Sequence, residues 1–141
     1  MKAFEATARI KAKPEAIWAV LTDGASYPDW DSGVVSVEGS IAEGQKIKLV
    51  SEVNPKRVFS LKVTSFDPAK SMTWTGGMPL RLFRGVRTFT LFPAAKGSTR
   101  FTMREEYTGP LMPLIGRSIP DLGPSFEQFA NGLKRRVERG K

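Results

Sequence analysis

The stretch LFRGVRTFTLFPAAKGSTRFTMREEY, residues 82–107, contains two runs in which apolar and polar residues alternate. The runs, Leu82–Phe92 and Thr99–Tyr107, are typical of strands with one buried face. Between them, Ala95-Lys96-Gly97 predicts a three-residue hairpin loop that places Gly97 in a left-handed conformation. The stretch therefore predicts an antiparallel β-hairpin.

The loop length sets the register of this hairpin, because a shift of one residue would move every side chain to the other face. A charge that is buried alone is costly, so an inward Arg or Glu needs an opposite charge or a polar group of a ligand. The predicted pairs on the inward face are Leu91 with Phe101, Phe89 with Met103, and Arg87 with Glu105.

Five further segments show strand-like alternation, with turn residues such as Gly39, Asn54-Pro55 and Asp67-Pro68 between them. No helical pattern separates the last four of them, which favours an antiparallel sheet. The connection Gly76-Gly77-Met78-Pro79 resembles either a pocket-mouth loop or an ordinary wide turn. The predicted strands are Phe4–Lys11, Val34–Glu38, Gln45–Glu52, Arg57–Phe66 and Ser71–Thr75.

Helical patterns lie near both ends of the chain. Lys13-Pro14-Glu15 begins a short helix that Asp23-Gly24 ends, and a turn-rich segment, Ala25–Ser32, follows. A long amphipathic helix is predicted over Ser125–Arg139, with Ser125-x-x-Gln128 as its capping signal. A weaker segment, Leu111–Ile119, precedes it, and Pro120 and Pro124 predict a break between the two.

The composition excludes several kinds of chemistry. The 141 residues include no cysteine and no histidine. Disulfides, thiolate nucleophiles, Ser-His-Asp triads and the commonest transition-metal ligands are therefore excluded. We expect no metal and no cofactor, and acid–base chemistry would need a tuned carboxylate, Lys, Tyr or bound water. Without an apolar leader or a membrane-length segment, a cytoplasmic location is the expectation.

The net charge of +8 is concentrated near the C-terminus. One interpretation is a solvated helix end, where cations suit the helix dipole. The other is a patch for an anionic membrane surface, formed by Lys134, Arg135, Arg136 and Arg139, with Lys141 beyond them. No nucleic acid is expected as a partner, because no nucleic-acid-binding motif accompanies the charge.

The order of elements predicts an α+β fold. The expected fold is a seven-stranded curved antiparallel sheet wrapped around the long C-terminal helix, with two short helical segments after the first strand. One face of the sheet must be covered, and the C-terminal helix is the main element available to cover it. A bent sheet around one helix tends to leave space, so an apolar cavity between them is plausible. Residues 1–141 are expected to form a single domain.

Several motifs in this order resemble those of the START and polyketide cyclase/dehydrase superfamily, also called SRPBCC, the helix-grip fold of the major birch-pollen allergen. They are Ala12-Lys13-Pro14-Glu15-Ala16-Ile17-Trp18, Leu21-Thr22-Asp23, Tyr27-Pro28-Asp29-Trp30, Gly97-Ser98-Thr99-Arg100 and Glu105-Glu106-Tyr107-Thr108-Gly109. The resemblance covers nearly the whole chain and implies a hydrophobic cavity for lipids, polyketides, sterols or hormones. Its members share no catalytic motif, so no catalytic residue is carried over.

Ten residues are candidates for ligand contact because their faces point toward the long helix. Each has an alternative interpretation as ordinary core. Trp18, Tyr27 and Trp30 are either packing residues or a wall at the cavity mouth. The ten candidates are Phe59, Leu61, Met72, Trp74, Phe89, Phe101, Met103, Leu122, Phe126 and Phe129.

Three functions remain open. The first is a binding module for a hydrophobic small molecule or lipid, with few convergent polar groups. The second is a cyclase or dehydratase without metal or histidine, for which Arg87, Glu105 and Tyr107 are the catalytic candidates. Alternatively, Arg87 and Glu105 could form a structural ion pair, with Tyr107 beside it. The third is a membrane-surface or protein-interaction module that uses the basic C-terminus. Because the chain lacks His and Cys, we expect it to hold a ligand rather than transform one.

Overall fold

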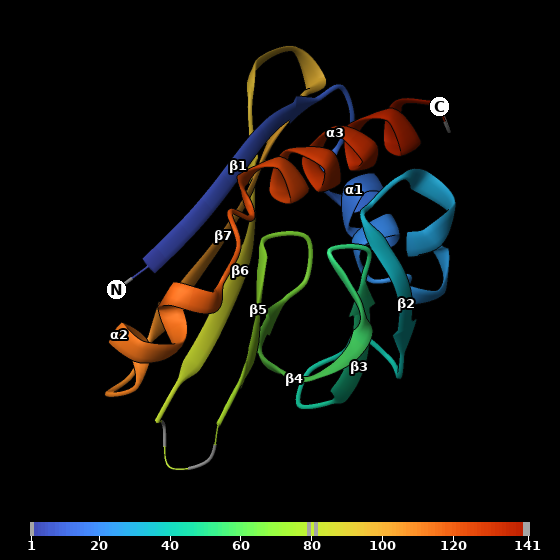
Figure 1. Ribbon diagram of the computed structural model, residues 1–141. Helices are drawn as coiled ribbons and strands as arrows, with labels where there is room; N and C mark the ends of the chain where they lie inside the picture. The colour runs from blue at the N-terminus through green and yellow to red at the C-terminus, as the bar shows by residue number, and fades with distance from the viewer. Residues whose placement is uncertain (1, 79, 81, 140–141) are drawn as a thin grey trace.

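The computed structural model describes residues 2–78, 80 and 82–139 of the chain. Seven antiparallel strands form one curled sheet in the order β1-β7-β6-β5-β4-β3-β2 (Figure 1). Register shifts in the β2/β3, β3/β4 and β4/β5 pairs add to the bending of the sheet. The strands are β1 Lys2–Ile10, β2 Val34–Glu38, β3 Lys46–Ser51, β4 Asn54–Asp67, β5 Ser71–Gly77, β6 Arg84–Pro93 and β7 Thr99–Thr108.

The long helix α3 (Gly123–Arg139) packs across this sheet, which is the predicted helix-grip arrangement (Figure 1). Its buried face carries Phe126, Phe129, Leu133 and Val137. The segment after β1 forms two helical pieces, as predicted, and two short pieces precede α3. These are α1 Pro14–Leu21, the 3₁₀ helix η1 Gly24–Trp30, α2 Met112–Ile115 and the 3₁₀ turn η4 Gly116–Ser118; a further 3₁₀ turn, η3 Ala95–Gly97, joins β6 to β7.

The β6–β7 hairpin confirms the predicted register and loop. Gly97 has a positive φ of 72°, and Lys96 before it shares the left-handed conformation, with a φ of 60°. The cross-strand partners are Leu91 with Phe101, Phe89 with Met103 and Arg87 with Glu105. Alternation and loop length were therefore sufficient to place an arginine opposite a glutamate.

The strand boundaries differ from the prediction by up to three residues, and two of these differences change the interpretation of a turn. Strand β4 begins at Asn54 and includes Pro55, because the ladder is irregular there and proline is tolerated where no ladder hydrogen bond is needed. Strand β5 continues through Gly77, because Gly76 pairs with Gly85 of β6. The two glycines therefore belong to the sheet and not to a flexible connection, and Pro79 lies outside the described residues.

The start of α3 also differs from the prediction. Residues 119–122 are not helical, which confirms the predicted break. The helix begins at Gly123, whose N–H donates to the Asp121 carboxylate at 2.9 Å. Ser125 lies inside the first turn instead of capping it, and Gln128 donates to Asp31 at 2.8 Å. The predicted capping box is therefore wrong, because Asp121 already provides the cap.

An aromatic cluster fills the space under the middle of α3. Phe129 lies at its centre, with ring centroids 5.1–6.1 Å from those of four other aromatic residues. This packing joins the helix, η1 and the sheet into one core. The four partners are Tyr27, Trp30, Phe89 and Phe101.

Candidate functional site

The cross-strand pair of Arg87 and Glu105 is the polar centre of the concave face. The Nε atom of Arg87 donates to Oε1 of Glu105 at 2.5 Å, and the two side chains are 19% and 12% exposed. Because β6 and β7 both turn these residues toward the helix side, the pair lies among apolar neighbours. The structure thus brings two of the three catalytic candidates into direct contact.

Aromatic rings surround this ion pair. The guanidinium of Arg87 lies 5.0 Å from the centroid of the Phe126 ring, in the first turn of α3. Phe126 in turn packs against Phe4 of β1, with ring centroids 6.0 Å apart. A cation over an aromatic face is attracted by the ring quadrupole, more strongly where water is excluded. The helix start therefore covers the arginine.

Tyr107, the third candidate, lies beside the pair on the same face of β7. Its ring stacks on Phe83 with centroids 5.7 Å apart, and it meets Phe4 edge-on at 6.3 Å. Burial raises the pKa of the Tyr107 hydroxyl well above its usual value, and the nearby charge of Glu105 and a hydrogen bond to it raise the pKa further. The hydroxyl therefore remains protonated and acts as a hydrogen-bond donor at neutral pH.

Two donor groups beside the pair have no protein acceptor. Glu105 occupies only the Nε atom of Arg87, and within the described part of the chain no hydrogen bond reaches the two terminal nitrogens. Trp74, the cross-strand neighbour of Arg87 on β5, has a buried indole N–H with no partner among these residues. Of these donors only the Trp74 N–H is fully buried, and Nε of Arg84 is a second buried donor without a partner among the described residues. Buried donors without partners are rare in folded proteins and mark places where water or a ligand is expected.

Nine of the ten ligand-contact candidates lie in the core or pack against it, whereas Phe59 does not, and the ten fall into two groups by exposure. Phe59, Leu61 and Leu122 are half-buried. The other seven are at most 2% exposed, so they offer almost no accessible surface in this conformation. The helix-covered half of the interior is thus filled by side chains. The seven are Met72, Trp74, Phe89, Phe101, Met103, Phe126 and Phe129.

Two paired strand glycines help to shape the concave face, and the sequence analysis did not assign them this role. A Cβ at Gly76 would lie 2.5 Å from Cδ2 of Leu61. A Cβ at Gly85 would lie 3.1 Å from the Tyr107 ring and 3.4 Å from Oε2 of Glu105. Glycine within a strand often marks such a close approach, and this was the signal available for Gly85.

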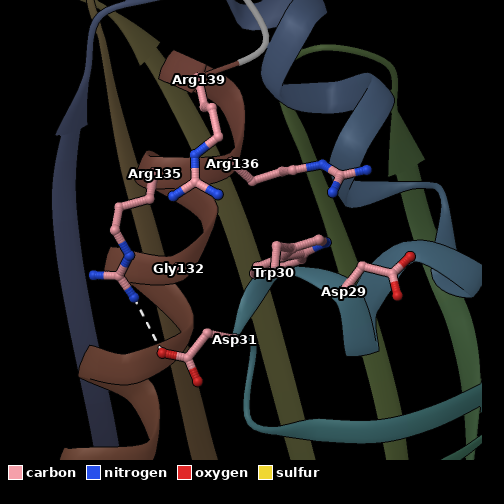
Figure 2. A pocket seen from close by; sticks show the side chains of 7 residues that line it. All are labelled: Asp29, Trp30, Asp31, Gly132, Arg135, Arg136 and Arg139. Atoms are coloured by element: carbon pink, nitrogen blue, oxygen red, sulfur yellow. Dashed lines mark hydrogen bonds and ion pairs between the residues drawn. The ribbon is translucent and has the colours of Figure 1, made fainter.

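A pocket lies on the outer side of α3, between this helix and η1 (Figure 2). We call it the arginine pocket; its volume is about 410 Å³. Lys134 does not belong to it, because its Nζ donates to the Arg9 carbonyl and to Glu138, both at 2.7 Å. Lys141 lies outside the described residues. The lining residues are Asp29, Trp30, Asp31, Gly132, Arg135, Arg136 and Arg139.

Another pocket, of about 650 Å³, lies beside α2 and the end of β7. Lys2 and Arg117 line it together with Met112 and Pro113. The Nζ atom of Lys2 donates to the carbonyl oxygens of Gly116 and Ile119, at 3.3 and 3.2 Å. The lysine therefore attaches the segment before α3 to the first strand.

Two searches of the described residues gave negative results. No group of three or more Asp and Glu side chains is placed to hold a metal ion. No helix in the described part of the chain has the length and apolarity needed to cross a membrane.

Comparison with known proteins supports the fold. No functionally curated sequence matches the chain significantly. Among solved structures, a protein from Mesorhizobium loti is 21% identical with a TM-score of 0.77, and 99% of each chain is covered. The Zhui aromatase/cyclase from Streptomyces sp. R1128 is 17% identical with a TM-score of 0.74, covering 98% of this chain and 94% of its own.

Two further solved structures have the same fold. A START superfamily protein from Mycobacterium smegmatis is 20% identical with a TM-score of 0.69, with 99% of each chain covered. A truncated norcoclaurine synthase from Thalictrum flavum is 18% identical with a TM-score of 0.72, covering 99% of this chain and 95% of its own. Residues 1–138 match the family described as polyketide cyclase / dehydrase and lipid transport, and the chain belongs to this family.

Proposed function

We propose that this chain is a single-domain binding protein for a hydrophobic small molecule or lipid that carries an oxygen acceptor. The apolar part of the ligand contacts the half-buried end of the concave face, and the oxygen lies at Arg87. The unoccupied terminal nitrogens of Arg87, held within an aromatic wall, are the observation that carries this proposal.

The position of the apolar contact follows from exposure. The seven buried residues, two from α3 and five from the sheet beneath it, belong to one core and have at most 2% of their surface exposed, so a ligand there would have to displace the core. Phe59, Leu61 and Leu122 retain accessible surface. Aromatic and aliphatic side chains of this kind form the larger part of small-molecule sites, and a few polar groups orient the ligand.

The polar end of the ligand follows from the donors. Arg87 offers terminal N–H groups, and Trp74 offers an indole N–H from the neighbouring strand. Glu105 uses one side of the arginine and fixes its position. A carboxylate or carbonyl oxygen suits this arrangement, because a charge-assisted hydrogen bond in an apolar surrounding is stronger than a neutral one.

The alternative function, a cyclase or dehydratase, has weaker geometric support. An acid–base carboxylate works best when its pKa lies near the operating pH. Glu105 instead accepts from Arg87 at 2.5 Å, so its carboxylate is already engaged in an ion pair. Tyr107 has a raised pKa and keeps its proton, so it is suited to donating a hydrogen bond rather than removing a proton.

Native mass spectrometry of the purified protein tests the proposal by identifying molecules that remain bound. We expect an apolar species with a carboxylate or carbonyl group, and we expect Arg87→Met to lose most of it. Arg100→Met is the matched control, because Arg100 lies on the opposite face of β7 and contacts Phe92.

A defined pair of ligands isolates the role of the oxygen. Saturation-transfer NMR should detect binding of 2-naphthoate by the native protein, with Arg87→Met weakening it and leaving 2-methylnaphthalene unaffected. Equal loss of both ligands would show that Arg87 acts only through the fold, and equal binding by both arginine variants would place the ligand elsewhere.

A further inference from the structure

We propose that the arginine pocket is a second binding site, specific for a phosphate-type oxyanion. It is separate from the interior site, because it lies on the outer side of α3 against η1 (Figure 2). The ligand is either free phosphate, a soluble phosphate ester or the phosphate of a lipid headgroup.

The arrangement of charges on α3 is the first argument. Arg135, Arg136 and Arg139 lie within little more than one helical turn, and like charges three or four residues apart repel one another. Arg135 is neutralised by Asp31, at 3.1 Å. Arg136 and Arg139 have neither an ion pair nor a hydrogen bond with any residue that the structure describes. Two guanidinium groups in the pocket therefore lack a counter-ion.

The close approach of η1 to the helix is the second argument, since it makes the surface concave. A Cβ at Gly132 would lie 2.5 Å from the Trp30 carbonyl oxygen and 2.6 Å from that of Asp31. Glycine at this position therefore lets η1 lie directly against the helix backbone. The three arginine side chains extend around this contact, and Figure 2 shows Trp30 in the middle of the group.

The two acidic residues narrow the choice of ligand. Asp31 adopts a left-handed backbone conformation, with φ at 58°, and its carboxylate is held by both Arg135 and Gln128. Asp29 lies across the pocket from Asp31 (Figure 2). Its negative charge would repel a second anionic group of a ligand. Three arginines and two aspartates leave a net charge of +1. The pocket thus favours one compact oxyanion over an extended polyanion.

The geometry of the free groups favours phosphate. A guanidinium presents parallel N–H donors that match two oxygens of a phosphate, which gives bidentate contacts that lysine cannot form. The volume of about 410 Å³ falls within the range of small-molecule sites. It leaves space for the organic part of a phosphate ester beside the oxyanion.

Titration of ¹⁵N-labelled protein with inorganic phosphate tests the proposal through the Nε–Hε signals of the arginines. We expect saturable shifts of the pocket arginines at millimolar phosphate, and at least about tenfold weaker binding by Arg136→Gln/Arg139→Gln. The control Lys46→Gln/Lys62→Gln removes the same charge from exposed positions on β3 and β4 and should bind like the native protein. Equal weakening by both double variants would overturn the proposal in favour of general electrostatic attraction.

Vesicles distinguish the possible sources of the oxyanion. Phosphatidylcholine vesicles containing phosphatidic acid should bind the native protein and not Arg136→Gln/Arg139→Gln if the phosphate belongs to a lipid headgroup. Binding of phenyl phosphate in solution without vesicle binding would identify a soluble ester. Equal binding to vesicles of phosphatidylserine at matched charge would overturn the proposal in favour of general attraction to an anionic surface, and no response to any of the three probes would refute a phosphate site.

Discussion

Replacing Glu105 by glutamine tests whether the Arg87–Glu105 pair is as buried as the structure shows. The substitution keeps the size of the side chain and one acceptor oxygen, but it leaves the arginine charge without an opposite charge. Removing one partner of a buried ion pair costs about 3–5 kcal/mol, whereas exposed pairs contribute about 0–1 kcal/mol. With 19% and 12% of the side chains exposed, we expect a loss of about 2 kcal/mol, between these limits.

Urea unfolding followed by fluorescence measures this loss. For a domain of this size, about 2 kcal/mol corresponds to a fall of about 1 M in the urea midpoint. The matched control is Glu106→Gln on the opposite face of β7, where Glu106 pairs with Arg104 at 3.4 Å and both side chains are more than 40% exposed. The control should change stability by less than about 0.5 kcal/mol.

The double variant Arg87→Met/Glu105→Leu completes the experiment. Replacing a buried ion pair by apolar residues of similar size is often neutral or stabilising. The double variant should therefore be more stable than Glu105→Gln alone. If Glu105→Gln and Glu106→Gln unfold at the same urea concentration, the pair is solvated and the argument for an inward polar group fails.

Three further predictions concern the packing and the tyrosine. Gly132→Ala should lower the free energy of unfolding by about 1–2 kcal/mol, because the overlap with the Trp30 carbonyl outweighs the gain in helix propensity. The control Asn131→Ala, at an exposed position on the same helix, should be neutral or slightly stabilising. A Gly132→Ala variant that is more stable than the native protein would refute the close contact. Phe129→Ala should cost about 3–5 kcal/mol in urea unfolding, since it removes the centre of the aromatic cluster, and a loss below about 1 kcal/mol would contradict the packing. The raised pKa of Tyr107 stabilises the protonated folded state, so this contribution is present below the unfolded pKa of about 10 and is lost as the pH rises above it. Native protein should therefore lose stability between pH 9 and about 11.5 more steeply than Tyr107→Phe, and parallel curves would show that the hydroxyl is solvated.

The sheet and the inward ion pair could be predicted because both depend on local patterns. Alternation assigned the faces of β6 and β7, and the loop around Gly97 set their register, so Arg87 and Glu105 followed without tertiary information. The extent to which side chains fill the interior could not be predicted in this way. It depends on how far α3 approaches the curled sheet, and Phe129 closes much of that space through partners from three distant segments.

The arginine pocket was beyond prediction for a related reason. The sequence showed a basic helix end, and it could not separate Lys134, which is bound to Glu138 and the Arg9 carbonyl, from Arg136 and Arg139. The pocket also depends on Gly132, which lets η1 lie directly against the helix backbone. A glycine inside a predicted helix was the available signal, and it indicates close packing without naming the partner.

The two sites differ in how their charges are balanced, and this difference separates their roles. At the interior site the Arg87 charge already has Glu105 as counter-ion, so a bound oxygen adds hydrogen bonds to a neutral pair and the apolar surface supplies most of the affinity. In the arginine pocket two guanidinium groups have no counter-ion, so an anion there is attracted by charge. Raising the salt concentration should therefore weaken phosphate binding strongly and leave binding of a neutral apolar ligand nearly unchanged. Equal salt dependence at both sites would contradict this division.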